Sequence, residues 1–103
     1  MYIVIFVTTK NVIEANKIAK SLVSQKLIAC ANIIKGVTSV FWWDNKAQQA
    51  SECLLVIKSR KSLFPKIAKA VKSLHSYSVP EVIALPIIAG NKEYLNWVKD
   101  STK

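Results

Sequence analysis

The sequence predicts an α/β fold of the α+β kind, in which the elements follow one another as β-α-β-β-α-β with one more helix at the C-terminus. Three observations predict it: a β-branched run at residues 2–9, two segments with apolar residues at helical spacing, and two long strand-like runs that meet at residues 44–45. This order is the split βαβ, or ferredoxin-like, arrangement. The length of 103 residues suits one domain, so we expect residues 1–103 to fold as a single unit.

A strand followed by a helix is predicted for the first 26 residues. Residues 2–9 are rich in β-branched side chains and carry no charge, which is typical of a strand buried on both faces. Asn11, with Glu14 three positions later, resembles a capping box at the start of a helix. Apolar residues then recur at helical spacing as far as about Lys26: Val12, Ala15, Ile18, Ala19, Leu22 and Val23.

The middle of the chain predicts an unusually long hairpin. Residues 27–34 and 37–43 form its first strand, interrupted at Lys35-Gly36, where a glycine inside a strand pattern indicates a bulge or bend. Asp44-Asn45 is suited to a tight turn because both residues tolerate left-handed backbone angles. Residues 46–59 return as the second strand of the hairpin. We expect its end to project beyond the helices that cover the sheet.

The last part of the chain predicts a helix, a strand and a final short helix. Ser62 is placed to cap the first of these, with Pro65 in its first turn, where a missing N–H costs little. Residues 82–89 form the strand, in which Pro86 marks an irregularity or a sheet edge. Residues 90–91 begin the final helix.

Two helices on one face of an antiparallel sheet leave the other face uncovered. The edges of the sheet and the projecting hairpin would lack partners as well. We therefore expect other copies of the chain to cover these surfaces in a symmetric homo-oligomer.

Composition argues against a nucleic-acid or membrane role. The 15 Lys and Arg residues exceed the 6 acids and give a net charge of +9, but the lysines are spread along the chain and no nucleic-acid motif accompanies them. No apolar run approaches the roughly 18–20 residues that span a bilayer. The N-terminal strand has neither the basic residues nor the cleavage site of a signal peptide. The sequence predicts a cytoplasmic protein in which Cys30 and Cys53 stay reduced.

Several segments together resemble one known family, the CutA divalent-cation-tolerance proteins. They are residues 29–33 (A-C-A-N-I), 41–46 (F-W-W-D-N-K), 74–82 (L-H-S-Y-S-V-P-E-V) and 91–97 (N-K-E-Y-L-N-W), with Glu52 and Lys58-Ser59 between them. Each segment alone is a weak signal. The likeness is specific because the segments occur in order and with matching spacing over residues 3–99.

The resemblance implies a PII-like homotrimer in which extended hairpins complete sheets between subunits. It also implies a role in tolerance of divalent metals, copper in particular, and no assigned reaction. The chain shows no nucleophile–base pair and no glycine-rich phosphate loop, so we expect that it is not an enzyme.

Three residues are candidate metal ligands, each with a structural alternative. His75 is the only histidine and can ligate copper or zinc, but it also suits a cap at a helix end, whose dipole favours the charged form. Glu81 can bind a metal or pair with a lysine such as Lys58. Cys30 can supply a thiolate, which Cu(I) favours, or can be a neutral buried thiol. The expected ion is divalent, with Cu(II) foremost, and its ligands can come from two or three chains.

A cleft between subunits is the second candidate site. Trp42, Trp43 and Tyr77 would be an aggregation liability if exposed, so they are expected either to pack against a neighbouring subunit or to line a cleft. In the second case Trp43, Tyr77 and Lys58 would hold a small ligand beside His75 and Glu81.

The chain departs from the family pattern at three positions near these residues. Ser76 replaces a usual proline and should make the loop less rigid, while Ser59 replaces threonine, a small change. Ser78 replaces a common glutamate, which weakens the case for a hard cation more than that for a soft one.

Two functions are therefore predicted. The first is a trimeric cytosolic protein that binds divalent or copper ions and contributes to metal tolerance. The alternative is a PII-like trimer that binds a small anionic effector in the intersubunit cleft, as the positive charge and Lys58 suggest.

Overall fold

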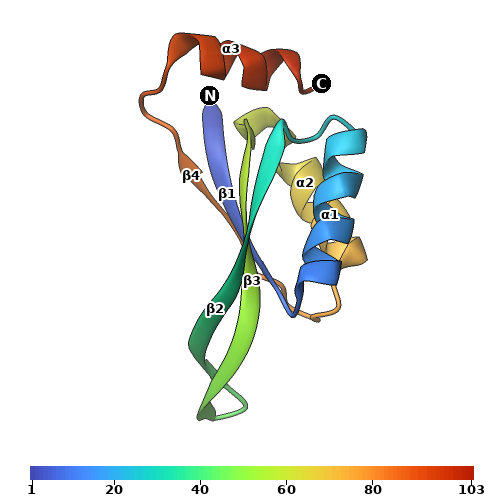
Figure 1. Cartoon of the computed structure of the whole chain (residues 1–103), viewed down its shortest axis with the longest axis vertical. Coiled ribbons are helices and arrows are strands. Elements are labelled where there is room, and N and C mark those ends of the chain that lie inside the picture. The colour runs from blue at the N-terminus through green and yellow to red at the C-terminus, as the bar shows by residue number, and fades with distance from the viewer.

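The secondary structure follows the predicted order (Figure 1). The computed structural model describes residues 1–103. Its strands are β1 (Tyr2–Thr9), β2 (Cys30–Trp43), β3 (Lys46–Arg60) and β4 (Val82–Pro86). Its helices are α1 (Val12–Ser24), α2 (Phe64–Leu74) and α3 (Lys92–Asp100), and a 3₁₀ turn, Lys61–Leu63, precedes α2. The predicted β-α-β-β-α-β order with an added C-terminal helix is confirmed.

The four strands form one antiparallel sheet in the order β2-β3-β1-β4. Along β1, side chains alternate between buried and half-buried, with Ile3, Ile5 and Val7 on the buried side. A strand places successive side chains on opposite faces, so this alternation means that only one face is fully covered. The sequence predicted burial on both faces, which a single chain does not provide.

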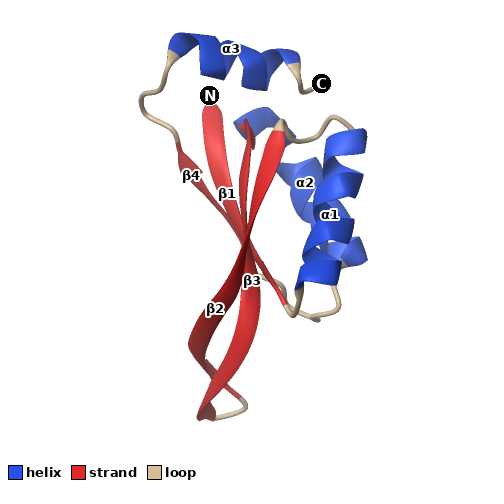
Figure 2. Ribbon diagram, in the orientation of Figure 1, coloured by secondary structure: helices blue, strands red, loops and turns tan.

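Helices α1 and α2 both cover the same face of the sheet (Figure 2). Their apolar stripes bury Ile18, Leu22, Ile67 and Val71 against the inward side chains of β1 and β3. The opposite face carries half-exposed Ile34, Ile83 and Leu85. We call that surface the free face. None of the helices has the length and apolar character needed to cross a membrane.

The long hairpin is confirmed, and its far half extends beyond the rest of the sheet (Figure 1). Strand β1 stops pairing with β3 at Thr9 and Cys53, whereas β2 and β3 remain paired from Val37 to the tip. The register shifts between Ile34 and Val37, where Gly36 has a φ of +70°, so the predicted bulge is present. Asp44 and Asn45, with φ of 54° and 59°, form the predicted tight turn.

Four element boundaries differ from those predicted by more than one residue. Helix α1 ends at Ser24 because Lys26 takes a left-handed φ of 57°, and β2 begins only at Cys30. Ser62 does not cap α2; it lies within the 3₁₀ turn, and the cap position is held by Leu63 without a side-chain hydrogen bond. Strand β4 ends at Pro86, which has no N–H to continue the ladder.

Helix α3 lies across the end of the sheet that is opposite the hairpin tip (Figure 1). It begins at Asn91, whose side chain accepts hydrogen bonds from the N–H groups of Glu93 and Tyr94. Its C-terminal end is held by Arg60, which donates to the Thr102 hydroxyl at 2.8 Å and to the Lys103 carbonyl. These contacts fasten the final helix to the end of β3.

The N-terminus of α1 is tied to the segment that follows α2. The Asn11 side chain accepts from the Glu14 N–H at 2.9 Å, as in the predicted cap. The Glu14 carboxylate does not return to the cap residue itself; it accepts from the Lys10 N–H at 3.4 Å and the Ser76 N–H at 2.9 Å. Burial raises the pKa of Glu14, but the hydrogen bonds from Ser76 and Lys10 outweigh the effect of burial and leave the pKa below its ordinary value.

We expect Glu14→Gln to reduce stability at neutral pH by about 1–2 kcal/mol, because an amide accepts these two N–H bonds less strongly than a carboxylate. The native pKa lies below that of the unfolded chain, so this contribution is present above the unfolded value and is lost as pH falls through the folded value. Urea unfolding at pH 7 and pH 3, at one protein concentration, measures the difference.

The matched control is Glu93→Gln, which removes an exposed carboxylate from the first turn of α3. It should change stability by a few tenths of a kcal/mol at most. An equal cost of Glu14→Gln at both pH values would contradict the ionic role of this carboxylate.

Candidate functional site

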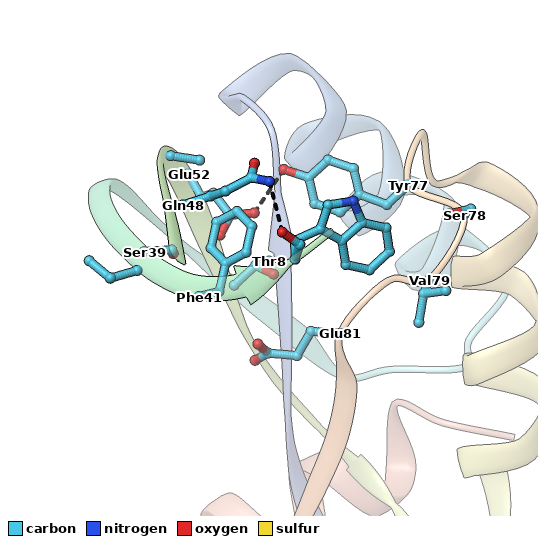
Figure 3. A pocket seen from close by; sticks show the side chains of 12 residues that line it. Thr8, Ser39, Phe41, Gln48, Glu52, Tyr77, Ser78, Val79 and Glu81 are labelled. Carbon is cyan, nitrogen blue, oxygen red and sulfur yellow. Dashed lines mark hydrogen bonds between the residues drawn. The ribbon is translucent and has the colours of Figure 1, made fainter. Parts of the chain in front are cut away.

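A cavity of about 720 Å³ lies between the far half of the hairpin and the segment that follows α2 (Figure 3). One wall comes from β2 and β3, and includes Phe41, Trp43 and Glu52. The other wall comes from the loop that leads into β4, and includes Tyr77 and Glu81. Residues far apart in the chain therefore meet at this place.

The strand period explains how the hairpin builds its wall. Ser39, Phe41 and Trp43 alternate along β2, so their side chains lie on one face. Gln48 stands opposite Phe41 in the register, and its side-chain amide donates to the Trp43 carbonyl at 3.0 Å. Glu52 stands opposite Val37, at the inner end of the same wall.

Tyr77 and Glu52 join the two walls by a hydrogen bond. The Tyr77 hydroxyl donates to Oε2 of Glu52 at 2.8 Å, and the Glu52 residue is only 8% exposed. Burial, this hydrogen bond and the negative charges of Glu52 and Glu14 raise the pKa of Tyr77 to about 12. The phenol therefore stays protonated and holds the loop against the hairpin (Figure 3).

His75 lies just outside the cavity, at the C-terminal end of α2. Its Nδ1 accepts a hydrogen bond from the Tyr77 N–H at 3.1 Å, which requires a lone pair on that nitrogen. Its Nε2 lies 2.7 Å from the Thr8 carbonyl and therefore carries the proton and donates it. With a hydrogen bond at each ring nitrogen, His75 positions Tyr77.

Cys30 and Lys58 lie at the other end of the sheet, next to α3. They stand opposite each other in the β2–β3 register. The Cys30 Sγ is 3.5 Å from the Tyr94 hydroxyl, and this hydrogen bond, followed by burial, raises the pKa of Tyr94 to about 12. Lys58 donates to the side-chain oxygen of Asn32. Cys30 is partly exposed, whereas Cys53 is buried as predicted, and both are free thiols.

One chain therefore brings together only some of the predicted site residues. Tyr77, Trp43 and Glu81 share the cavity, and His75 contacts Tyr77. Cys30 and Lys58 lie elsewhere, and no group of three or more His, Cys, Asp or Glu side chains surrounds a point where a metal ion could bind. The predicted metal site and the predicted intersubunit cleft both require a second chain and stay predictions.

Sequence reasoning gave Glu52 no role in the site. The signal was present, because a glutamate directly before the apolar run Cys53–Ile57 is unusual in a buried strand. Phe41 was also missed as a wall residue, although it lies two positions before Trp43 and therefore on the same face of the strand. The hydrogen bond between Glu52 and Tyr77 had no signal in the sequence, because it depends on how the loop after α2 folds back against the hairpin.

The charge of the cavity is opposite to that of the chain. Its lining has two carboxylates, Glu52 and Glu81, and no lysine, arginine or histidine. A single chain thus offers an anion no positive partner there. The alternative function, binding of an anionic effector, remains a prediction about a cleft between chains. A second chain would have to contribute its Lys58 to that cleft.

Comparison with known proteins agrees with the fold and the motifs. The family model described as "CutA1 divalent ion tolerance protein" matches residues 3–101. The divalent-cation tolerance protein CutA of Thermus thermophilus is 43% identical over 96% of this chain and 96% of its own length. Chloroplastic CutA 1 of Oryza sativa is 50% identical over 98% of this chain but only 57% of its own length. The chain thus spans little more than half of its plant and animal relatives.

Solved structures give the same result. The Thermus thermophilus divalent cation tolerance protein superposes with a TM-score of 0.98 over 100% of both chains, at 43% identity. A periplasmic divalent cation tolerance protein from Archaeoglobus fulgidus reaches 0.97 over 100% of both chains, at 38% identity. With matches of this extent in sequence and structure, the chain belongs to the CutA1 divalent ion tolerance protein family.

Proposed function

We propose that the chain acts as a homotrimeric divalent-cation tolerance protein that binds metal ions, copper foremost. The observation that carries this proposal is the match over residues 3–101 to a family described by divalent ion tolerance and by no reaction. Two relatives that match 96% and 100% of this chain carry divalent-cation tolerance in their names. A non-enzymatic role accords with that description.

The surface of one chain supports assembly with further copies. Ile34, Ile83 and Leu85 are 46%, 52% and 49% exposed on the free face, where an apolar sheet surface calls for a partner. The far half of the hairpin is a two-stranded ribbon, a structure that is marginal in water without further strands or packing. It also exposes Trp42 by 71%. Contacts with neighbouring chains would bury both surfaces.

We expect the chain to have three times the 11.5 kDa mass of one subunit in solution, as measured by light scattering or native mass spectrometry. Leu85→Asp on the free face should lower the assembled fraction at least tenfold, because burying a carboxylate there without a partner is costly. Ile88→Asp is the matched control, since Ile88 lies outside the strands and is 94% exposed. A native chain that stays monomeric at every concentration would contradict the trimer.

The candidate metal ligands differ in availability. Glu81 forms no ion pair with Lys58 or any other residue. The only acidic side chain that lies close to a basic one is Glu14, beside His75. Its carboxylate is therefore free to bind a metal. Cys30 offers a partly exposed thiol that suits copper. Both nitrogens of His75 are engaged by backbone groups, so metal binding by its Nδ1 would have to replace the hydrogen bond from Tyr77.

We expect calorimetric titration with Cu(II) to show binding by the native chain and at least tenfold weaker binding by Glu81→Gln and by Cys30→Ser. His75→Ala should also weaken binding. This substitution also removes the contacts to Thr8 and Tyr77, which could disturb the fold. Its copper binding is therefore compared only if its circular dichroism matches that of the native chain. Glu93→Gln, on exposed α3, is the control and should bind copper as the native chain does.

Copper binding that is unchanged in all three variants would refute these ligands while leaving metal binding intact. Absence of copper binding in the native chain would refute the metal-binding part of the proposal. The cytoplasmic location stays a prediction, because relatives carry chloroplastic and periplasmic in their names.

A further inference from the structure

The cavity described above has a local charge that the chain as a whole does not share. The chain carries a net charge of +9, yet two of its 6 acidic residues lie in this one lining and none of its 15 basic residues does. Inside a concave site the nearest charges dominate the electric field. The carboxylates of Glu52 and Glu81 therefore act more strongly on a ligand in the cavity than the distant lysines do. The cavity attracts cations.

Glu52 has an oxygen that the protein leaves available. The Glu52 residue is more than nine-tenths buried, and its Oε2 accepts from Tyr77. Its Oε1 has no partner in the chain. In this structure every side-chain oxygen or nitrogen that is fully buried has a hydrogen-bond partner. Because Oε1 of Glu52 has none, it cannot be fully buried and must keep some accessible surface. A buried carboxylate with one free oxygen at a cavity wall is an acceptor for a charged donor that enters the cavity.

Aromatic rings surround the same space. Phe41 and Trp43 come from β2, and Tyr77 comes from the opposite wall (Figure 3). Within one chain Phe41 is 40% exposed and Trp43 is 53% exposed, so the chain's own residues do not fully cover either ring. An organic cation is attracted to aromatic faces within about 6 Å by the ring quadrupole, and it can pack its carbon atoms against them.

The size and donor set of the cavity distinguish between classes of cation. About 720 Å³ lies in the range of small-molecule sites, roughly 300–1,000 Å³. A bare metal ion would find no group of three ligating side chains there and would fill little of the space. An ammonium or guanidinium group on an apolar body can use both the carboxylates and the rings.

We propose that this cavity binds a small organic cation, a primary ammonium or guanidinium compound with an apolar or aromatic body. The charged group binds Oε1 of Glu52 and is attracted by Glu81, and the body packs among Phe41, Trp43 and Tyr77. The site goes beyond metal tolerance and uses neither Cys30 nor His75 as a ligand.

Binding is tested on the native assembly with EDTA present, so that metal ions play no part. The probe is phenethylamine, and the matched probes are 2-phenylethanol, which is neutral, and phenylacetate, which is an anion. Calorimetry or ligand-observed NMR should show the amine binding at least tenfold more tightly than either. Benzyltrimethylammonium, which cannot donate a hydrogen bond, should bind at least threefold more weakly than the amine.

Variants assign the contacts. Glu52→Gln should weaken binding of phenethylamine at least tenfold, and Glu81→Gln at least threefold. Glu93→Gln, on α3, is the control for loss of one negative charge and should leave binding unchanged.

Three outcomes would overturn the proposal: no binding of phenethylamine by the native protein, tighter binding of phenylacetate, or equal binding of the amine by native and Glu52→Gln proteins of matching circular dichroism. None of these outcomes bears on copper, which is measured without EDTA. The two proposals share only Glu81, since Cys30 and His75 belong to the copper proposal and Glu52 to the organic-cation proposal. The organic-cation site and the metal-binding function can therefore fail separately.

Discussion

The difference in length between β1 and the β2–β3 hairpin is the constraint on which the rest of the structure depends. Strand β1 ends opposite Cys53, while β2 and β3 continue together to the turn at Asp44-Asn45. Beyond that point the hairpin has no third strand, so both of its faces and edges lack a partner within the chain. One of these faces becomes a cavity wall because the loop after α2 folds against it. The rest can be buried only by another molecule.

The loop that forms the other wall depends on contacts outside the cavity. Glu14 accepts from the Ser76 N–H, and His75 bonds both the Thr8 carbonyl and the Tyr77 N–H. Ser76 supplies for the contact with Glu14 an N–H that a proline at position 76 would lack. With the loop so held, the Tyr77 hydroxyl reaches Glu52, and a helix end thereby determines the shape of a site on the hairpin.

The parts of the structure that follow from local periodicity were predictable, and those that follow from long-range contacts were not. The order of the elements along the chain, the bulge at Gly36 and the turn at Asp44-Asn45 all have local signals, and they are present. The contact of His75 with Thr8 joins residues 67 positions apart, so no spacing in the sequence reports it. The sequence grouped Lys58 with Tyr77 in a cleft between subunits. Within one chain the register places Lys58 beside Cys30 at the far end of the sheet, so that grouping stays a prediction about two chains.

Net charge and local charge lead to opposite conclusions about the ligand. The excess of lysine suggested an anionic effector, because a positive protein attracts anions from a distance. That long-range attraction is screened over about 10 Å in salt, whereas a buried carboxylate acts on a bound ligand at contact distance. Steering toward the surface and selection inside a cavity are thus separate properties. The lysines determine which molecules approach the chain, and Glu52 and Glu81 determine which of them the cavity retains.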